Sequence, residues 1–544
     1  MFKLEDGSIA ILDEGQLGRL KSLLQLAEME KGHVRFRRNQ VALLDALLAS
    51  QPEIEADAML ERARKELQNF KGIAMAEQPA GFAGELRGYQ REGLGWLQFL
   101  NRFQFGGCLA DDMGVGKTAQ VLALLEMRRA ARAAGEAIGP SLVVAPRSLI
   151  FNWQREAARF TPQLRTLDFT GLGRSLEEIP DYDVILTTYG TLRRDIVALQ
   201  NHQFDYVILD EAQAIKNFGS ASSKAARLLK ANHRLTMTGT PVENHLGELW
   251  SLFEFLNPGM LGKASVLRLS GAGSRTVAPE TRELLAAGLR PFLLRRTKEQ
   301  VAKELPAKVE QTLFCELEAD ERKLYNELRD HYRASLLAGT SRTWNKRKMQ
   351  VLEALLRLRQ AACHPGLVDK KRATGSSTKL DTLLSQLEEV LQEGHKALIF
   401  SQFTSLLALV RAQLDAQGAT YEYLDGKTRD RQAPVQRFQN DPGCKLFLIS
   451  LKAGGVGLNL TAADYVFLLD PWWNPAVEAQ AIDRTHRIGQ GKPVFAYRLI
   501  AKDTVEERVL ELQSSKRELA TAILNEDNAL VSNLKPEDLE LLLS

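Results

Sequence analysis

Two separate series of short apolar runs alternate with helical stretches along this chain of 544 residues. The first series, at about 84–260, contains GGCLAD, SLVVAP, DVILTTY, YVILD and RLTMTGT. The second, at about 378–505, contains KALIFSQ, KLFLIS, DYVFLLD and VFAYRLIA. Short apolar runs separated by helices are typical of βαβ units, in which a parallel sheet is buried on both faces. The sequence therefore predicts an α/β fold with two parallel-sheet lobes.

The segments around these series divide the chain further. Residues 1–83 open directly into a strand-like piece, Ser8 to Leu12, followed by helical patterns, so we expect an accessory segment that is the end of a larger domain. A mostly helical, basic region with a linker separates the lobes, and amphipathic helical patterns close the chain. The expected parts are an accessory segment (1–83), lobe 1 (84–260), helical protrusions and linker (261–377), lobe 2 (378–515) and a helical brace (516–544).

The charge balance of the chain is nearly even. Lys and Arg number 71 against 68 Asp and Glu, which gives a formal net charge of +3. A hydrophobic share of 44% with 26% charged residues is typical of a folded protein rather than a disordered one. Contact with a nucleic acid would therefore depend on local basic faces and not on an overall positive field.

Cysteine spacing and hydropathy indicate the cellular compartment in which the protein is expected. The four cysteines form no CxxC pair, which argues against a disulfide framework or a zinc site. Cys363 stands beside His364, and we expect a buried thiol next to a His that ends a helix. No apolar run reaches the length of a bilayer span, and the first residues are acidic and lack a signal-like apolar stretch. We expect a cytoplasmic protein, associated with the nucleoid if its source is bacterial.

The tract DDMGVGKT at 111–118 lies between an apolar strand and a helical stretch, where a phosphate-binding loop is found. Gly114 and Gly116 would let backbone N–H groups wrap the phosphates. Lys117 would reach the β and γ oxygens, and the Thr118 hydroxyl would bind Mg²⁺. Asp111 breaks the strict pattern GxxxxGKT, so a chance glycine-rich turn is the alternative. The loop residues expected at the ATP site are Asp112, Met113, Gly114, Val115, Gly116, Lys117 and Thr118.

The tract YVILDEAQ at 206–213 is an apolar strand that ends in two acids. One carboxylate in this position would hold the metal, and the other would polarise the attacking water. We assign the metal to Asp210 and the water to Glu211. Acids after a strand also cap helices, but a phosphate loop upstream in the same βαβ series favours the catalytic interpretation.

Two further tracts carry polar residues suited to phosphate chemistry. TMTGTPVEN at 236–244 combines a strand end with hydroxyls, which suits sensing of the γ-phosphate; a simple turn is the alternative. AQAIDRTHRIGQ at 479–490 places Arg484 and Arg487 three residues apart, which predicts one face of a helix. Two guanidinium groups there could reach a phosphate as arginine fingers, and a solvated basic face is the alternative.

In this order, DDMGVGKT, DEAQ, TGTPVEN, SLKAGGVGLNLTAADYVFLLDPWWNP and DRTHRIGQ resemble the motif set of Swi/Snf-type ATPases of helicase superfamily two. The resemblance covers about residues 84–515, is closest to bacterial members, and implies RecA-like lobes that use ATP and Mg²⁺. It implies that Gln90 contacts adenine and that Gly457 belongs to the ATP site. Gln213, also assigned to that site, stands where many members carry His. The implied catalytic set is Lys117, Asp210, Glu211, Arg484 and Arg487.

The resemblance also implies that both lobes grip the backbone of duplex DNA. Hydroxyls, backbone amides and a lysine in the matching segments suit phosphate contacts, which carry no base code. Basic stretches at 295–298 (RRTK), 342–348 and 370–372 would extend the grip or are ordinary solvated faces. The implied DNA contacts are Pro146, Arg147, Thr188, Gln402, Lys452, Asn459 and Trp472, with Trp473 beside the last.

Three functions remain open at this point. The favoured one is an ATP-dependent translocase that moves along duplex DNA, without strand separation, and remodels or displaces DNA-bound proteins. The second is a strand-separating helicase of the same superfamily. The third is a scaffold with weak ATPase activity on RNA polymerase or another DNA-bound complex. We expect double-stranded DNA as the partner, no membrane, and a monomer.

Overall fold

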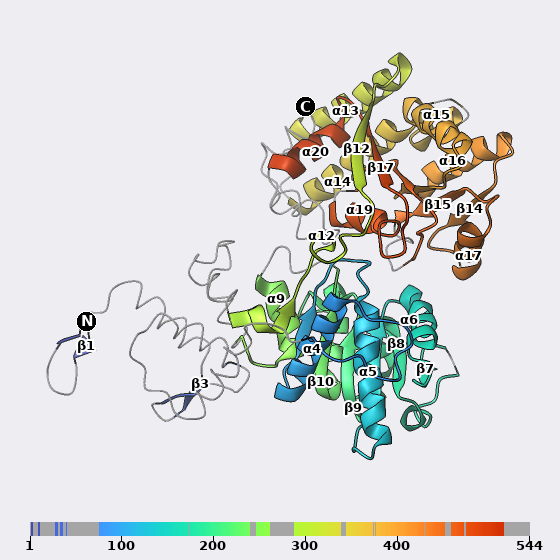
Figure 1. Ribbon diagram of the computed structural model, residues 1–544. Coiled ribbons are helices and arrows are strands. Elements are labelled where there is room, and N and C mark those ends of the chain that lie inside the picture. Colours follow the sequence, from blue (N-terminus) through green and yellow to red (C-terminus); the bar gives the residue numbers. More distant parts are fainter. Residues whose placement is uncertain are drawn as a thin grey trace. The chain divides into compact units, whose positions relative to one another are not determined.

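A computed structural model describes residues 75–515 except 172, 240–245, 262–287, 339–343, 374, 376, 429, 452–457, 473 and 474; before residue 75 it describes 2–3, 9–10, 28–30, 33–35 and 40. The chain divides into two compact units, Met1–Val301 and Ala302–Ser544. Each unit has one large parallel sheet flanked by helices (Figure 1). This confirms the predicted α/β fold with two parallel-sheet lobes.

The sheet of the first unit has seven strands in the order β11-β5-β10-β9-β6-β8-β7, and all its neighbours pair in parallel. The apolar runs expected to form strands do so. These are β5 (Gly107–Leu109), β6 (Ser141–Ala145), β8 (Val184–Thr188), β9 (Gln203–Leu209) and β10 (Lys230–Met237). The sheet also contains β7 (Thr166–Asp168) and β11 (Leu293–Leu294), which were not expected.

Helices bury this sheet on both faces, which is why its strands read as continuous apolar runs. Leu142 and Val144 of β6 pack in one core with residues of α7, α8 and α9, while the intervening Val143 is equally buried. The α-helices in the described part of this unit are α4 (Gly88–Phe103), α5 (Lys117–Ala133), α6 (Arg147–Phe160), α7 (Tyr189–Leu199), α8 (Ala221–Leu228), α9 (Leu246–Leu256) and the short α12 (Lys298–Val301).

The sheet of the second unit has six parallel strands in the order β12-β17-β16-β13-β15-β14. Ala397 and Ile399 of β13 pack against α15 and α16, and Leu398 and Phe400 face α17 and α19. The strands are β12 (Lys308–Cys315), β13 (Ala397–Ser401), β14 (Tyr421–Leu424), β15 (Leu446–Ser450), β16 (Tyr465–Leu468) and β17 (Val494–Ala501). The helices named here are α15 (Thr378–Gln392), α16 (Thr404–Ala416), α17 (Gln432–Asn440) and α19 (Pro475–Ile482).

The region between the lobes differs from the mostly helical segment expected for 261–377. It contains α13 (Ala319–Ala338) and α14 (Trp344–Cys363), but β11 extends the first sheet and β12 pairs along its whole length with β17. A strand of two residues has no periodicity to detect, and β12 is a half-exposed edge strand without a continuous apolar run. Its place in the sheet is therefore decided by tertiary pairing.

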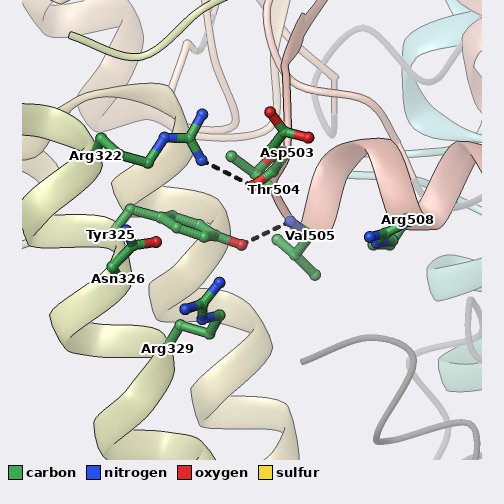
Figure 2. A pocket seen from close by; sticks show the side chains of 8 residues that line it. All are labelled: Arg322, Tyr325, Asn326, Arg329, Asp503, Thr504, Val505 and Arg508. Carbon is green, nitrogen blue, oxygen red and sulfur yellow. Dashed lines mark hydrogen bonds between the residues drawn. The ribbon is translucent and has the colours of Figure 1, made fainter. Parts of the chain in front are cut away.

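Helices α13 and α14 pack against α20 (Val505–Ser515) in the second unit. Figure 2 shows how this contact is fixed: the Tyr325 hydroxyl oxygen accepts a hydrogen bond of 2.7 Å from the Val505 N–H at the start of α20. Arg322 donates to the carbonyl of Asp503 at 2.8 Å, beside a cavity of about 320 Å³. The arginines of that cavity are engaged elsewhere, because Arg329 pairs with Asp330 and Arg508 with Glu511.

Cys363 ends α14 as a buried thiol and His364 caps the next turn, as predicted. Ile9–Ala10 of the expected strand at Ser8 to Leu12 form β2, which pairs with β1 (Phe2–Lys3). The expected helices before residue 75 and the brace at 516–544 lie outside the described residues. Within the described part of the chain, no helix combines the length and apolar character needed to cross a membrane.

Candidate active site

The motifs of lobe 1 meet at one edge of its sheet. β5 leads into the phosphate loop, β10 into the TGT tract and β9 into Asp210 and Glu211, and these three strands are direct neighbours. Because parallel strands end at the same edge, their following residues lie together, where α/β sheets bind ligands. The structure thus brings together the motifs that sequence reasoning assigned to one nucleotide site.

Backbone conformation in the phosphate loop requires glycine at two positions. Gly114 and Gly116 have φ of +83° and +80°, in the left-handed region. A Cβ at Gly116 would also lie 2.4 Å from Nε2 of Gln90. Tyr89 and Gln90 donate hydrogen bonds of 2.7 and 3.2 Å to the Val115 carbonyl, which fixes the loop from behind.

Gln90 itself is buried, with both ends of its amide engaged within the protein. Its Nε2 bonds to Val115, and its Oε1 accepts from the Arg87 N–H at 3.0 Å as part of a capping box at the start of α4. The amide keeps a second N–H and a second lone pair, so these two bonds leave it able to contact adenine. The role implied for Gln90 stays a prediction.

Lys117 opens α5 with its amine turned back onto the loop. Its Nζ donates to the carbonyls of Asp111 and Asp112 at 2.6 and 3.0 Å. Burial lowers the pKa of this amine, against the opposing charges of Glu211, Asp111 and Asp210. The acids of the other motifs therefore lie close enough to Lys117 to act on its charge.

Asp210 follows β9 and is held by two donors. Trp153 Nε1 donates to Oδ2 and the Glu211 N–H donates to Oδ1, each at 2.9 Å. Burial raises the pKa of Asp210 to about 7, with the Glu211 carboxylate adding to the rise, while the Trp153 hydrogen bond and the charge of Lys117 oppose it. Each carboxylate oxygen keeps a second lone pair, so Asp210 can still accept a cation.

Glu211 adopts a left-handed backbone conformation with φ of 50°, uncommon for a residue other than glycine. Its Oε2 accepts a hydrogen bond of 2.8 Å from Nε2 of Gln213. Gln213 Oε1 in turn accepts from the Thr238 hydroxyl at 3.4 Å. Gln213 thus connects the acid pair to the TGT tract, whose residues from Thr240 onward lie outside the described part.

The oxygen donors at this edge suit a magnesium ion. Carboxylate and hydroxyl oxygens are hard ligands, and Mg²⁺ in nucleotide sites is held by one or two of them together with substrate phosphates. Buried Asp210 supplies a carboxylate, and Thr118, the second residue of α5, carries the hydroxyl. Both residues fit the predicted metal site.

Three expected DNA contacts of lobe 1 lie at the same sheet edge. Pro146 and Arg147 follow β6, and exposed Arg147 is the first residue of α6. Thr188 ends β8, and its hydroxyl accepts the Thr191 N–H at 3.1 Å as the N-cap of α7. Their contact with DNA stays a prediction.

In lobe 2 the two candidate arginine fingers do not share a helix face, so that expectation is wrong. α19 ends at Ile482, and Arg484 and Arg487 lie in the turns that follow. The Thr485 hydroxyl donates a hydrogen bond of 2.7 Å to the Ile482 carbonyl, and this bond competes with the backbone hydrogen bonds that would continue the helix. Gln490 fixes the turn by donating to the Ala463 carbonyl at 2.8 Å. Arg484 is buried and Arg487 half-buried.

Two expected DNA contacts of lobe 2, Gln402 and Trp472, lie beside Asp470, which follows β16. The Gln402 N–H is 3.2 Å from each Asp470 oxygen, and the Ser401 hydroxyl also donates to this carboxylate. The backbone N–H of Trp472 donates a hydrogen bond of 2.7 Å to the Glu478 carboxylate. Asn459 is half-buried near the start of the tract that precedes β16. Lys452, Gly457 and Trp473 lie outside the described residues.

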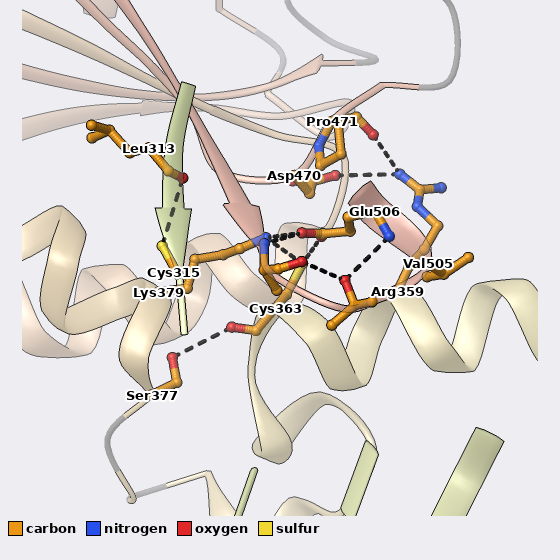
Figure 3. Close-up of polar contacts among 12 residues, drawn as sticks. Leu313, Cys315, Arg359, Cys363, Ser377, Lys379, Asp470, Pro471, Val505 and Glu506 are labelled. Carbon is orange, nitrogen blue, oxygen red and sulfur yellow. Dashed lines mark hydrogen bonds and ion pairs between the residues drawn. The ribbon is translucent and has the colours of Figure 1, made fainter. Parts of the chain in front are cut away.

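A buried polar network joins α14, α15 and α20 to the segment that follows β16 (Figure 3). Arg359 of α14 donates to the Pro471 carbonyl at 2.8 Å and lies 3.9 Å from Asp470. Lys379 of α15 pairs with Glu506 of α20 at 2.5 Å. Burial raises the pKa of Asp470 to about 6, against the opposing charge of Arg359. The network fixes the backbone directly after Asp470.

Sequence reasoning missed three residues that shape the lobe 1 site. Trp153 binds Asp210, the Tyr189 hydroxyl donates to the Asp210 carbonyl at 2.8 Å, and Arg296 binds Asp111 at 2.6 Å. A buried Trp or Tyr needs a partner for its polar group, which was the available signal for the first two. Arg296 belongs to the RRTK stretch, for which the sequence suggested either a DNA contact or a solvated face. Its ion pair with buried Asp111 is neither of these.

Each lobe matches a known protein family. A sequence profile of the SNF2-related domain matches residues 89–367, and a profile of the helicase conserved C-terminal domain matches residues 378–489. A solved Sulfolobus solfataricus SWI2/SNF2 ATPase core in complex with dsDNA is 35% identical, covering 86% of this chain and 98% of that one, with a TM-score of 0.43.

Similar full-length proteins include an uncharacterized ATP-dependent helicase of Mycoplasma pneumoniae, 38% identical over 84% of this chain and 44% of its own length. The putative ATP-dependent helicase/translocase YwqA of Bacillus subtilis is 36% identical over 92% of this chain and 55% of its own. The TATA-binding protein-associated factor MOT1 of Saccharomyces cerevisiae is 32% identical over 89% of this chain and 30% of its own. The chain thus spans about half the length of its bacterial relatives or less. With more than half of its residues in the two matched domains, the chain belongs to the SNF2-related family of ATPases in helicase superfamily two.

Proposed function

We propose that this chain is an ATP-dependent translocase that moves along double-stranded DNA and remodels or displaces proteins bound to it, without separating the strands. The observation that carries the proposal is the connection of the acid pair to the TGT tract through Gln213. Such a connection lets the state of the bound nucleotide reach residues outside the phosphate loop.

In this proposal, Lys117 exchanges the carbonyls of Asp111 and Asp112 for the β and γ oxygens of ATP. Asp210 and Thr118 hold Mg²⁺, which would neutralise charge on the transferred phosphoryl group. Glu211 polarises the attacking water, with Gln213 orienting its carboxylate. Arg484 and Arg487 of lobe 2 supply positive charge to the transition state.

The grip on DNA is proposed for residues at the carboxyl edges of the two sheets. Their exposed or half-buried polar groups suit backbone contacts without base readout. Arg147 and Thr188 would serve in lobe 1, and Gln402 and Trp472 in lobe 2. Pro146, Lys452 and Asn459 are the remaining candidates for DNA contact. Gly457 is assigned to the ATP site instead.

The names of two relatives support translocation and the displacement of a DNA-bound protein. YwqA is named a helicase/translocase, and MOT1 is named a factor associated with the TATA-binding protein. A DNA-bound protein as the displaced object agrees with the second name. RNA polymerase is a narrower candidate for that object, and duplex binding would place the protein on the nucleoid.

The test measures ATP turnover with no nucleic acid, duplex DNA, single-stranded DNA and RNA in parallel. Duplex DNA should stimulate turnover most, and the stimulation should fall steeply with salt because counterions are released at each phosphate contact. Lys117→Ala is the control for catalysis at this site. Stronger stimulation by single strands or RNA would favour a strand-separating helicase, and turnover unaffected by any of them would favour a scaffold.

A further inference from the structure

The phosphate loop begins with an acid that the strict loop pattern does not contain. Asp111 is fully buried, and its carboxylate is held by Arg296, which lies 185 residues later in the chain. Arg296 Nη2 donates to Oδ2 at 2.6 Å, while Nε and the backbone N–H donate to Oδ1 at 3.1 and 3.0 Å. A buried carboxylate with this fork of donors is held in one orientation.

The same contact continues along the backbone. Ala110 N–H donates to the Leu294 carbonyl at 2.7 Å, and Asp112 N–H donates to the Arg296 carbonyl at 3.0 Å. The Lys298 N–H then binds the Asp112 carboxylate at 3.0 Å. The pairing of β5 with β11 is thereby extended beyond the sheet, so that residues 294–298 run beside the first residues of the phosphate loop.

Arg296 also reaches the helix in front of the loop. It donates to the Tyr89 carbonyl and, at 3.0 Å, to Oε1 of Gln120 in α5. Gly93 of α4 leaves the space for this arrangement, because a Cβ there would lie 1.8 Å from Gln120 Oε1 and 2.9 Å from Arg296 Nη2. One guanidinium group thus connects α4, the phosphate loop and α5.

We propose that Arg296, through Asp111, is a positioning residue of the nucleotide site and couples its occupancy to the segment at 293–301. This inference rests on the proposed phosphate-binding role of the loop. Lys117 is bonded to the carbonyls of Asp111 and Asp112, which belong to the two residues that Arg296 and its neighbours hold. When Lys117 turns to a phosphate, these carbonyls lose their donor, and the contacts of Arg296 and Lys298 with Asp111 and Asp112 are left to hold this stretch of backbone. The first compact unit ends at Val301, only five residues beyond Arg296, so the coupled segment leads directly into the second unit.

The first test compares two arginines that each form a two-pronged ion pair with a fully buried Asp. Arg128 binds Asp205 with bonds of 2.8 and 2.9 Å, in the same unit but with no contact to the loop. Arg296→Gln should raise the KM for ATP at least about tenfold, as expected when a group that holds a binding site in place is removed. Arg128→Gln should leave KM within about twofold while lowering the melting temperature. Equal KM values for both variants would overturn the positioning role.

A second variant covers the case in which Arg296→Gln does not fold. Arg296→Lys keeps the positive charge but cannot form the fork, so KM should still rise with the fold retained. A KM for Arg296→Lys equal to that of the wild type would contradict the proposal.

The coupling has a readout that is independent of turnover. In the full chain, backbone hydrogen exchange of residues 293–301 should change when ADP or a non-hydrolysable ATP analogue binds, and Asp111→Asn should abolish that change. Unchanged exchange in the wild type with nucleotide bound would overturn the coupling. The underlying function is tested separately: Lys117→Ala with normal turnover would reject the phosphate loop itself, whereas an inactive Lys117→Ala beside an unaffected Arg296→Gln would reject only this inference.

Discussion

The indole N–H of Trp153 donates a hydrogen bond of 2.9 Å to Oδ2 of Asp210, the acid assigned to magnesium. Trp153 lies in α6 and is almost fully buried. It fixes one oxygen of the carboxylate while the backbone of Glu211 fixes the other. The orientation of the proposed metal ligand is therefore set in part by a residue outside the tract that contains it.

Trp153→Phe should weaken the response to Mg²⁺. Phe fills most of the same space but offers no donor, so the Asp210 carboxylate loses one of its two restraints and a charge-stabilising hydrogen bond. We expect the concentration of Mg²⁺ required for half-maximal ATP turnover to rise about tenfold or more. Titration of turnover with Mg²⁺ at saturating ATP measures this. An unchanged titration in a folded variant would show that the indole has only a packing role.

Gln213 should tolerate replacement by His but not by Leu. Gln213 both donates to Glu211 and accepts from Thr238, and His also offers one donor and one acceptor. Gln213→His should keep DNA-stimulated turnover within about tenfold, whereas Gln213→Leu, which removes both bonds at similar size, should lower it further. Turnover is measured for both variants with saturating duplex DNA. Complete loss in Gln213→His would reveal a role that depends on the geometry of the amide.

Arg487→Ala should separate ATP binding from hydrolysis. An arginine finger stabilises charge that develops in the transition state and contributes about a thousandfold or more to the rate. ATP affinity should therefore stay within about tenfold while DNA-stimulated turnover falls by orders of magnitude, with DNA binding retained. Arg487 is the cleaner choice because Arg484 is 4% exposed and its removal would also disturb packing. Lost DNA affinity with normal turnover would instead indicate a DNA-binding surface.

Asp470→Asn should change how stability depends on pH. Burial raises the pKa of Asp470 from 3.8 to about 6, so its contribution to stability is complete below about pH 3.8 and is lost as pH rises through 6. That difference corresponds to about 3 kcal/mol at most. Relative to Asp470→Asn, the wild type should lose resistance to urea between pH 4 and pH 7. If the urea resistance of the two proteins depended on pH in the same way, the raised pKa of Asp470 would be contradicted.

Parts of this fold could be predicted from sequence because both sheet faces are covered. The runs that became β6, β9, β13 and β15 are continuous and apolar, since helices bury each strand on both sides. β7 and β14 were not predicted, because they lie at sheet edges and are only partly buried. Short or half-exposed strands leave too weak a periodic signal.

The candidate site also has parts that the sequence could predict and parts that it could not. Lys117, Asp210 and Glu211 follow strands in local motifs, so their shared sheet edge could be inferred from the order of strands and helices. The contact of Arg296 with Asp111 joins residues far apart in the chain, and no local pattern indicates it. The turn that carries Arg484 and Arg487 was mistaken for helix because hydrogen bonds from Thr485 and Gln490, not residue spacing, decide its path.

The most direct test of the proposed translocase is displacement of a third DNA strand from a triplex, with Lys117→Ala as the matched control. The protein should release the third strand only with ATP, and the variant should not. The same preparation should leave a duplex with a single-stranded tail intact, because movement along a duplex does not require its strands to separate. Efficient unwinding of the tailed duplex, or failure to release the third strand while DNA-stimulated turnover is normal, would contradict the account.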